Sequence, residues 1–206
     1  LLTYRTESRG LSNAYRVQLT GESLSTAAYG GSANDVASVS KNLNNLEFAY
    51  ANGSFKYQSE YSKMSLSASS PTTTSLSAYN TLTVSTSTYY HELVYNLTGE
   101  SWGYKNGVIT TVLPDNPAGG MWQLGLRYDT ADLNDGSVNF ANPAAPVVTG
   151  VMGGEESNWT VGVNWYWRSN FKFSANYVMV DSSKYSSSIK GFQDDNPEIF
   201  EFRAQL

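Results

Sequence analysis

The sequence predicts an all-β protein, and more specifically a transmembrane antiparallel β-barrel, on three observations. Segments in which apolar and polar residues alternate recur along the 206 residues, and no segment of helical period competes with them. Aromatic residues make up 14% of the chain and charged residues only 15%, against roughly 25% charged in a typical soluble domain. Short and long connections alternate along the chain, as in a membrane barrel that has short turns at one end and long loops at the other.

The C-terminal third shows the alternation most clearly. From Trp159 to Arg168, every odd position is Trp or Val, and the even positions are polar residues, Gly and Tyr. Ser169-Asn170 interrupts this pattern, which resumes from Phe171 to Met179. The break predicts a hairpin with a tight turn. Each arm reaches the roughly 9–11 residues that cross a bilayer when a strand is tilted.

The same pattern appears upstream. Asn52-Gly53 separates two alternating segments, and this dipeptide is a strong hairpin signal because both residues tolerate positive φ. In all, we expect about nine strands. They are predicted near residues 1–9, 12–20, 43–51, 54–67, 87–98, 120–132, 157–168, 171–181 and 198–206.

The connections sort by length. Those at Gly10-Leu11, Asn52-Gly53 and Ser169-Asn170 are short, and the long ones cover 21–42, 68–86, 133–156 and 182–197. The exception is 99–119, which is long although it falls on the short-turn side, and which contains a candidate extra strand at 108–112. This segregation of lengths favours a barrel over a soluble β-sandwich binding module, which is the alternative that composition leaves open.

Composition also excludes several functions. The chain has no Cys and a single His, His91, so it has no disulfide framework and no Cys-based or multi-His metal site. A net charge of −5 argues against nucleic-acid binding, and a mean hydropathy of −0.37 without long apolar runs argues against transmembrane helices. A barrel enzyme would need a nucleophile, a base and an oxyanion site. Since His91 falls on an apolar face, we expect no catalytic residue, no metal and no cofactor.

Several stretches together carry a family resemblance. They are Gly120-Met-Trp-Gln-Leu-Gly-Leu-Arg-Tyr-Asp129, Gly153-Gly-Glu-Glu-Ser-Asn-Trp-Thr-Val-Gly-Val-Asn-Trp-Tyr166 and Asn196-Pro-Glu-Ile-Phe200. As a set they resemble the phosphate-selective porin family (porins O and P) of Gram-negative outer membranes. Gln123 stands where that family usually has Glu. The resemblance covers about residues 42–206, and residues 1–41 match loosely.

The resemblance implies a barrel of about 16 strands, of which the strands expected here would be the C-terminal half. Residues 1–206 are therefore expected to form a single domain, the C-terminal part of an outer-membrane β-barrel. The implied function is that of a porin, which gives passive diffusion to small hydrophilic solutes, here anions such as phosphate. The implied partners are outer-membrane lipid, small anions and two further copies in a homotrimer.

Charged residues within the alternation are expected to face the lumen, because Arg or Lys on the lipid face costs about 2–4 kcal/mol at mid-membrane. By parity, the pore-lining candidates are Arg5, Arg9, Arg16, Lys56, Arg127, Arg168, Lys172 and Arg203. The acids expected on the same face are Glu7, Glu47, Glu60, Glu92, Asp129 and Glu201.

The arginine ladder that the resemblance implies for phosphate is absent, since Glu7 interrupts Arg5-x-Glu7-x-Arg9. We expect Arg127 and Asp129 to form a structural pair. Trp159, Trp165, Trp167, Tyr128 and Tyr177 are expected in aromatic girdles at the two membrane interfaces.

Overall fold

The computed structural model describes residues 38–69 and 81–206, except residues 107, 111–117 and 169. These residues form ten strands. None of them belongs to a helix that could cross a membrane. The strands are β1 (Ser38–Asn52), β2 (Phe55–Ser69), β3 (Thr81–Asn96), β4 (Gly103–Lys105), β5 (Val108–Thr110), β6 (Met121–Asn139), β7 (Val147–Arg168), β8 (Phe171–Ser186), β9 (Gly191–Asp195) and β10 (Glu198–Gln205).

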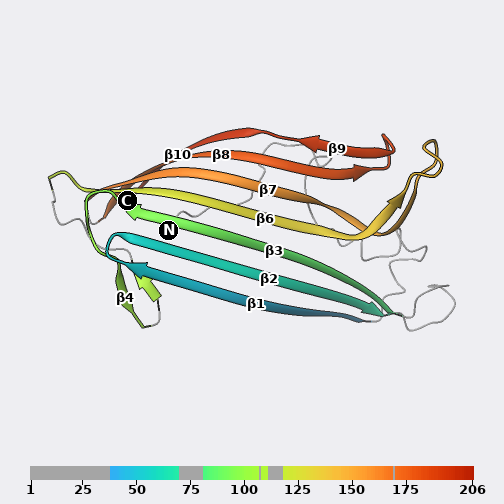
Figure 1. Cartoon of the computed structure of the whole chain (residues 1–206), viewed down its shortest axis with the longest axis horizontal. Helices are drawn as coiled ribbons and strands as arrows, with labels where there is room; N and C mark the ends of the chain where they lie inside the picture. Colours follow the sequence, from blue (N-terminus) through green and yellow to red (C-terminus); the bar gives the residue numbers. More distant parts are fainter. Residues whose placement is uncertain (1–37, 70–80, 107, 111–117, 169) are drawn as a thin grey trace.

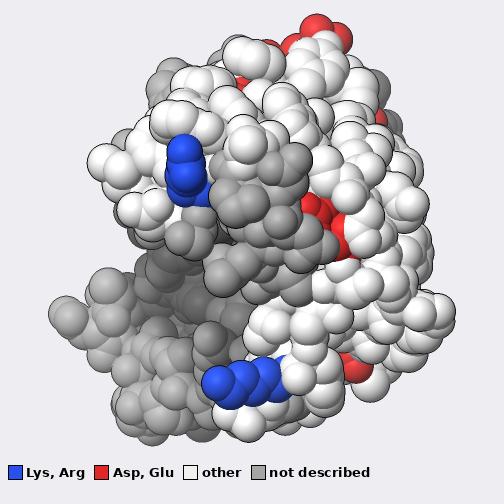
Figure 2. Space-filling view, turned by 90° about the vertical axis from the view of Figure 1, so that its left-hand side faces the viewer, with Lys and Arg blue, Asp and Glu red and all other residues white. Residues whose placement is uncertain are grey.

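One antiparallel sheet contains all the long strands, in the order β1-β2-β3-β6-β7-β8-β10. β9 also pairs with β8, and β4 and β5 form a separate small hairpin. The tight turns between β1 and β2 and between β7 and β8 lie at the same end of the long strands, which we call the turn end (Figure 1). We call the opposite end, where β6 is joined to β7, the loop end. Seen from the turn end, the described residues form an arc (Figure 2).

The predicted all-β antiparallel architecture is confirmed. Seven of the expected strands correspond to β1, β2, β3, β6, β7, β8 and β10, and those expected at 1–9 and 12–20 lie outside the described residues. The sheet is open within the described part of the chain, because β1 and β10 each have one edge without a partner strand.

Two of the expected long connections are wrong, because strands occupy much of them. β6 continues to Asn139 and β7 begins at Val147, so paired strands replace most of the loop expected at 133–156. In the same way, β9 lies within 182–197. Backbone pairing continues at the loop end, past the point where the alternation of apolar and polar residues weakens. The extra strand expected at 108–112 is present in part, as β5.

The first hairpin turn is shifted by one residue from its expected position. Asn52 pairs with Phe55, so Gly53 and Ser54 form the loop in place of Asn52-Gly53. Gly53 has φ of 55°, a conformation that glycine adopts without steric cost.

Gly120, which leads into β6, is a position where we predict a large effect of a single methyl group. It has φ of +71°, and an added Cβ would lie 2.4 Å from the carbonyl oxygen of Tyr166. Gly99 is a matched control, since its φ is +97° but no atom lies within 4 Å of an added Cβ. Gly99→Ala should cost about 1–3 kcal/mol from backbone strain alone, and Gly120→Ala should cost at least about 1 kcal/mol more because its neighbour is rigid backbone. Urea unfolding in detergent measures both, and equal midpoints would contradict the predicted close contact.

Candidate functional site

The two faces of the sheet have opposite character. On β7, the side chains of Trp159 and Val161 are 47% and 40% exposed, whereas Asn158 and Thr160 between them are 2% and 1% exposed. A soluble sandwich has the reverse arrangement, with its apolar face buried. We call the exposed apolar face the outer face and the polar face the inner face. The outer face includes Leu46, Phe48, Tyr50, Tyr61, Tyr89, Leu93, Tyr95, Trp122, Leu124, Leu126, Trp159, Val161, Tyr177, Met179, Phe200 and Phe202.

Aromatic side chains form two bands on the outer face. Near the turn end, the rings of Trp122 and Trp165 stack with centroids 5.3 Å apart. Further toward the loop end, the rings of Tyr128 and Trp159 lie 4.8 Å apart. Trp159 and Trp167 are eight residues apart on β7, which is about 26 Å along a strand, close to the roughly 25 Å apolar band of outer-membrane barrels. The aromatic side chains expected in girdles therefore lie on the apolar face.

His91 lies on the outer face, as its parity predicted. Its Nδ1 atom is 2.8 Å from the hydroxyl of Tyr57, and its ring packs 5.7 Å from that of Tyr89. These contacts, and its pairing with Tyr128, place His91 within the aromatic band nearer the loop end, on the face opposite the charged residues. Within the described part of the chain, no group of three or more His, Asp or Glu side chains could hold a metal ion.

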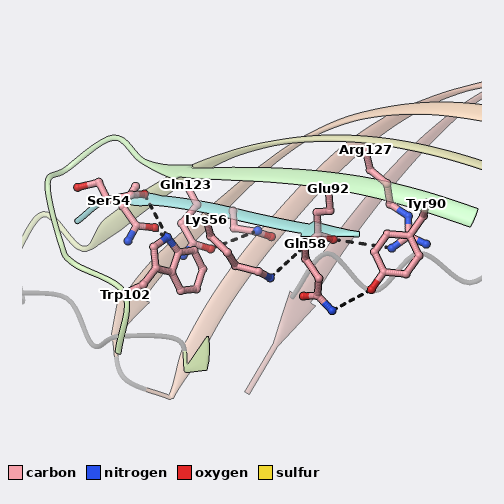
Figure 3. A network of polar contacts seen from close by, with 10 residues as sticks. Ser54, Lys56, Gln58, Tyr90, Glu92, Trp102, Gln123 and Arg127 are labelled. Carbon is pink, nitrogen blue, oxygen red and sulfur yellow. Dashed lines mark hydrogen bonds and ion pairs between the residues drawn. The ribbon is translucent and has the colours of Figure 1, made fainter. Parts of the chain in front are cut away.

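The inner face holds a cluster of four charged residues, Lys56, Glu92, Arg127 and Asp129, of which Figure 3 labels the first three. Lys56 Nζ lies 2.9 Å from Glu92 Oε1, and Arg127 Nη1 lies 3.8 Å from Glu92 Oε2. Arg127 Nε also donates to Asp129 Oδ1 at 2.9 Å, which confirms the pair expected from the sequence. Two cations and two carboxylates balance, and Lys56 and Glu92 are each only 4% exposed.

Trp102 explains why Lys56 is buried. This residue lies in the connection that follows β3 at the turn end, and Lys56 Nζ is 5.4 Å from its ring centroid. The connection is fixed to the β1–β2 turn, since Trp102 Nε1 donates to the carbonyl oxygen of Ser54 at 3.1 Å and Trp102 N donates to that of Gly53 at 2.9 Å (Figure 3). Lys56 therefore lies on the inner face, as expected, but under a tryptophan. Alternation could not reveal this, because Trp102 belongs to no long strand.

A chain of buried amides crosses the inner face beside this cluster. Gln123 Nε2 donates to Asn96 Oδ1 at 2.9 Å, and Asn164 Nδ2 donates to Gln123 Oε1 at 3.5 Å. Ser174 then donates to Asn164 Oδ1 at 2.7 Å. Gln123 uses its amide both as donor and as acceptor, which a carboxylate could not do. Its presence in place of the Glu expected from the resemblance thus has a local reason.

The other pore-lining candidates differ in placement. Lys172 is half-buried, with Nζ 5.1 Å from the Tyr166 ring centroid, and Arg203 pairs in register with inner-face Ser174. Neither has an ion-pair partner among the described residues. Arg168 follows a register shift, pairs with Phe171 and lies 5.5 Å from the Trp167 ring centroid. Strict alternation therefore stops before Arg168. The candidates Arg5, Arg9 and Arg16 lie outside the described residues.

Comparison with known proteins gives a consistent result. A family model described as "Phosphate-selective porin O and P" matches residues 6–206. Porin O of Pseudomonas aeruginosa is 32% identical over 190 residues, which cover 90% of this chain and 40% of that protein. An uncharacterised protein of Caulobacter vibrioides is 31% identical over 121 residues, which cover 57% of this chain and 22% of that protein. The chain thus spans less than half the length of either relative.

Proposed function

The chain belongs to the phosphate-selective porin O and P family. We therefore propose that its strands form part of the wall of an outer-membrane pore. Small hydrophilic solutes, and in particular anions such as phosphate, would diffuse passively along the inner face. One relative is named Porin O, and this name supports the proposal of a channel. It does not support an enzymatic function.

The observation that carries this proposal is the inverted polarity of the sheet. Apolar side chains are exposed on the outer face, and on β2, β3, β6 and β7 polar and charged side chains are buried on the inner face. Lipid would cover the outer face, and in outer-membrane barrels the short turns face the periplasm and the longer loops face outward. Since an open sheet edge is not viable in lipid, we propose that further strands meet the free edges of β1 and β10. We also propose a homotrimer, with parts of the outer face in contact between subunits.

An anion preference would come from Lys172 and Arg203 among the described residues. The charges of Lys56 and Arg127 are balanced by Glu92 and Asp129. Lys172 and Arg203 lie on neighbouring strands of the inner face without an ion pair in the described part of the chain. Unpaired Lys and Arg side chains along a pore favour anions.

Planar-bilayer recording of the detergent-purified protein tests the proposal. We expect discrete conductance steps, a reversal potential of anion-selective sign in a KCl gradient, and block by millimolar phosphate. Lys172→Gln with Arg203→Gln should reduce the anion-to-cation permeability ratio by at least about twofold, because both neutralise unpaired charges of the inner face. Lys63→Gln is the matched control, since exposed Lys63 has the parity of outer-face Tyr61 and should leave the ratio unchanged.

Each outcome decides something. The absence of steps would overturn the pore. Steps without anion preference would keep the pore and overturn the anion assignment, and steps that phosphate does not block would overturn phosphate as its solute.

A further inference from the structure

Charged side chains on the inner face are sorted by sign along the strands. Lys56 and Lys172 are each one residue from the turn-end terminus of their strands, Phe55 and Phe171, and Arg203 is two residues from Gln205. The acids lie at least four residues from these termini. They are Glu47, Glu60, Glu92, Asp129, Glu156 and Glu201. Among the described residues of these membrane-length segments, Arg127 is the one inner-face cation that lies further from the turn end, six residues from Met121 at the start of β6.

Ion pairing sharpens this separation. The cluster of Lys56, Glu92, Arg127 and Asp129 is balanced, and it extends from Lys56 near the turn end to Asp129, which is level with Glu60 in the register of the sheet. This leaves Lys172 and Arg203 toward the turn end. Four acids have no ion pair in the described part of the chain: Glu47, Glu60 and Glu156 lie further toward the loop end, and Glu201 lies two residues from Arg203 on β10. Further out, the described side chains of the strand extensions add two acids, Asp135 and Asp195, and one cation, Lys184.

Glu47 and Glu60 face each other directly across β1 and β2. Like charges directly opposite one another destabilise a sheet, so this pair has no rationale in stability. Asn45 Nδ2 lies between them and donates to Glu47 Oε1 at 3.3 Å and to Glu60 Oε1 at 2.6 Å. The two carboxylates are thus bridged by a neutral amide, which adds no positive charge between them. A local rule broken in this way points to a functional role.

We propose that this axial separation of charge makes the pore rectify ionic current. The inference rests on the proposed function. With the loop side positive, cations enter past the acidic end and anions enter past the cationic end, so both accumulate within the pore. With the opposite polarity, both kinds of ion are depleted. Current should therefore be larger when the loop side is positive.

The measurement is the current–voltage curve of single pores of known orientation. The chain has no Cys, so Ala145→Cys in the exposed loop between β6 and β7 gives a unique thiol within it. A bulky membrane-impermeant thiol reagent then reports which compartment faces the loop end. At 0.1 M KCl, where the Debye length is about 10 Å, we expect a ratio of at least about 1.5 between currents of opposite polarity. At 1 M, where the Debye length is about 3 Å, the ratio should fall to about 1.

Charge-neutralising variants identify the source of the asymmetry. Glu47→Gln, Glu60→Gln and Glu156→Gln combined should bring the ratio at 0.1 M close to 1. Glu155→Gln is the matched control, because exposed Glu155 adjoins Glu156 on the opposite face of β7 and carries the same charge. Circular dichroism confirms that each variant is folded.

Three results would overturn the inference without touching the proposed pore. They are symmetric currents at low salt, rectification of the opposite sign, and an effect of Glu155→Gln as large as that of Glu156→Gln alone. The absence of any conductance would overturn the proposed function instead.

Discussion

Leu124→Arg is expected to prevent stable insertion of the protein into lipid vesicles. Leu124 is exposed on the outer face, between Trp122 and Tyr128 of the two aromatic bands. A charged side chain near the middle of the lipid-facing band costs about 2–4 kcal/mol, which is a large part of the stability of an ordinary domain. The folded fraction in vesicles and the urea midpoint of the inserted protein measure the effect.

Ala49→Arg is the matched control for this prediction. Ala49 is exposed and lies on the inner face, two residues from Glu47 on the same strand. An arginine there would stay in water near a carboxylate, so we expect insertion within about 0.5 kcal/mol of the parent protein. Equal tolerance of both substitutions would show that the outer face does not meet lipid.

Glu92→Gln is expected to lower the free energy of unfolding by about 3 kcal/mol. Glu92 compensates Lys56, which is buried under Trp102. Removing one partner of a buried ion pair leaves an uncompensated charge, which typically costs 3–5 kcal/mol. Arg127 would still have Asp129, so the loss falls mainly on Lys56. Urea unfolding in detergent measures the change.

Two further variants separate lost charge compensation from lost packing. Glu60→Gln removes a half-buried carboxylate without an ion pair among the described residues, and should change stability by less than about 0.5 kcal/mol. Lys56→Met with Glu92→Gln removes both members of the buried pair, and should recover most of the loss caused by Glu92→Gln alone. If the double variant were as unstable as the sum of the single ones, the pair would carry no coupling energy.

Alternation predicted the membrane-length part of the seven long strands, because there the two faces of the sheet differ in polarity. Alternation did not predict the strands that continue at the loop end, because the two faces there do not differ in this way. Asn139 pairs with Val147 far from the aromatic bands, where neither face needs an apolar side chain. The five residues of β9 carry no clear alternation either, although their backbone pairs with β8.

The candidate site was predictable by face but not by environment. Parity placed Lys56, Arg127, Lys172 and Arg203 on the face where the structure has them. It could not show that Trp102 covers Lys56, because that contact joins positions far apart in the chain and one of them lies in a connection. The parity argument also assumed regular strand pairing up to Arg168, whereas a register shift precedes that residue.

The central claim is that one face of this sheet meets lipid and the other meets water. β1 tests it most directly, because residues on both of its faces are exposed. Single Cys variants at residues 45 to 50, labelled with a small fluorophore in vesicles, would be exposed in turn to a lipid-attached quencher and to aqueous iodide. The account predicts that the lipid quencher acts at residues 46, 48 and 50 and that iodide acts at residues 45, 47 and 49. Quenching by iodide at all six residues would contradict it.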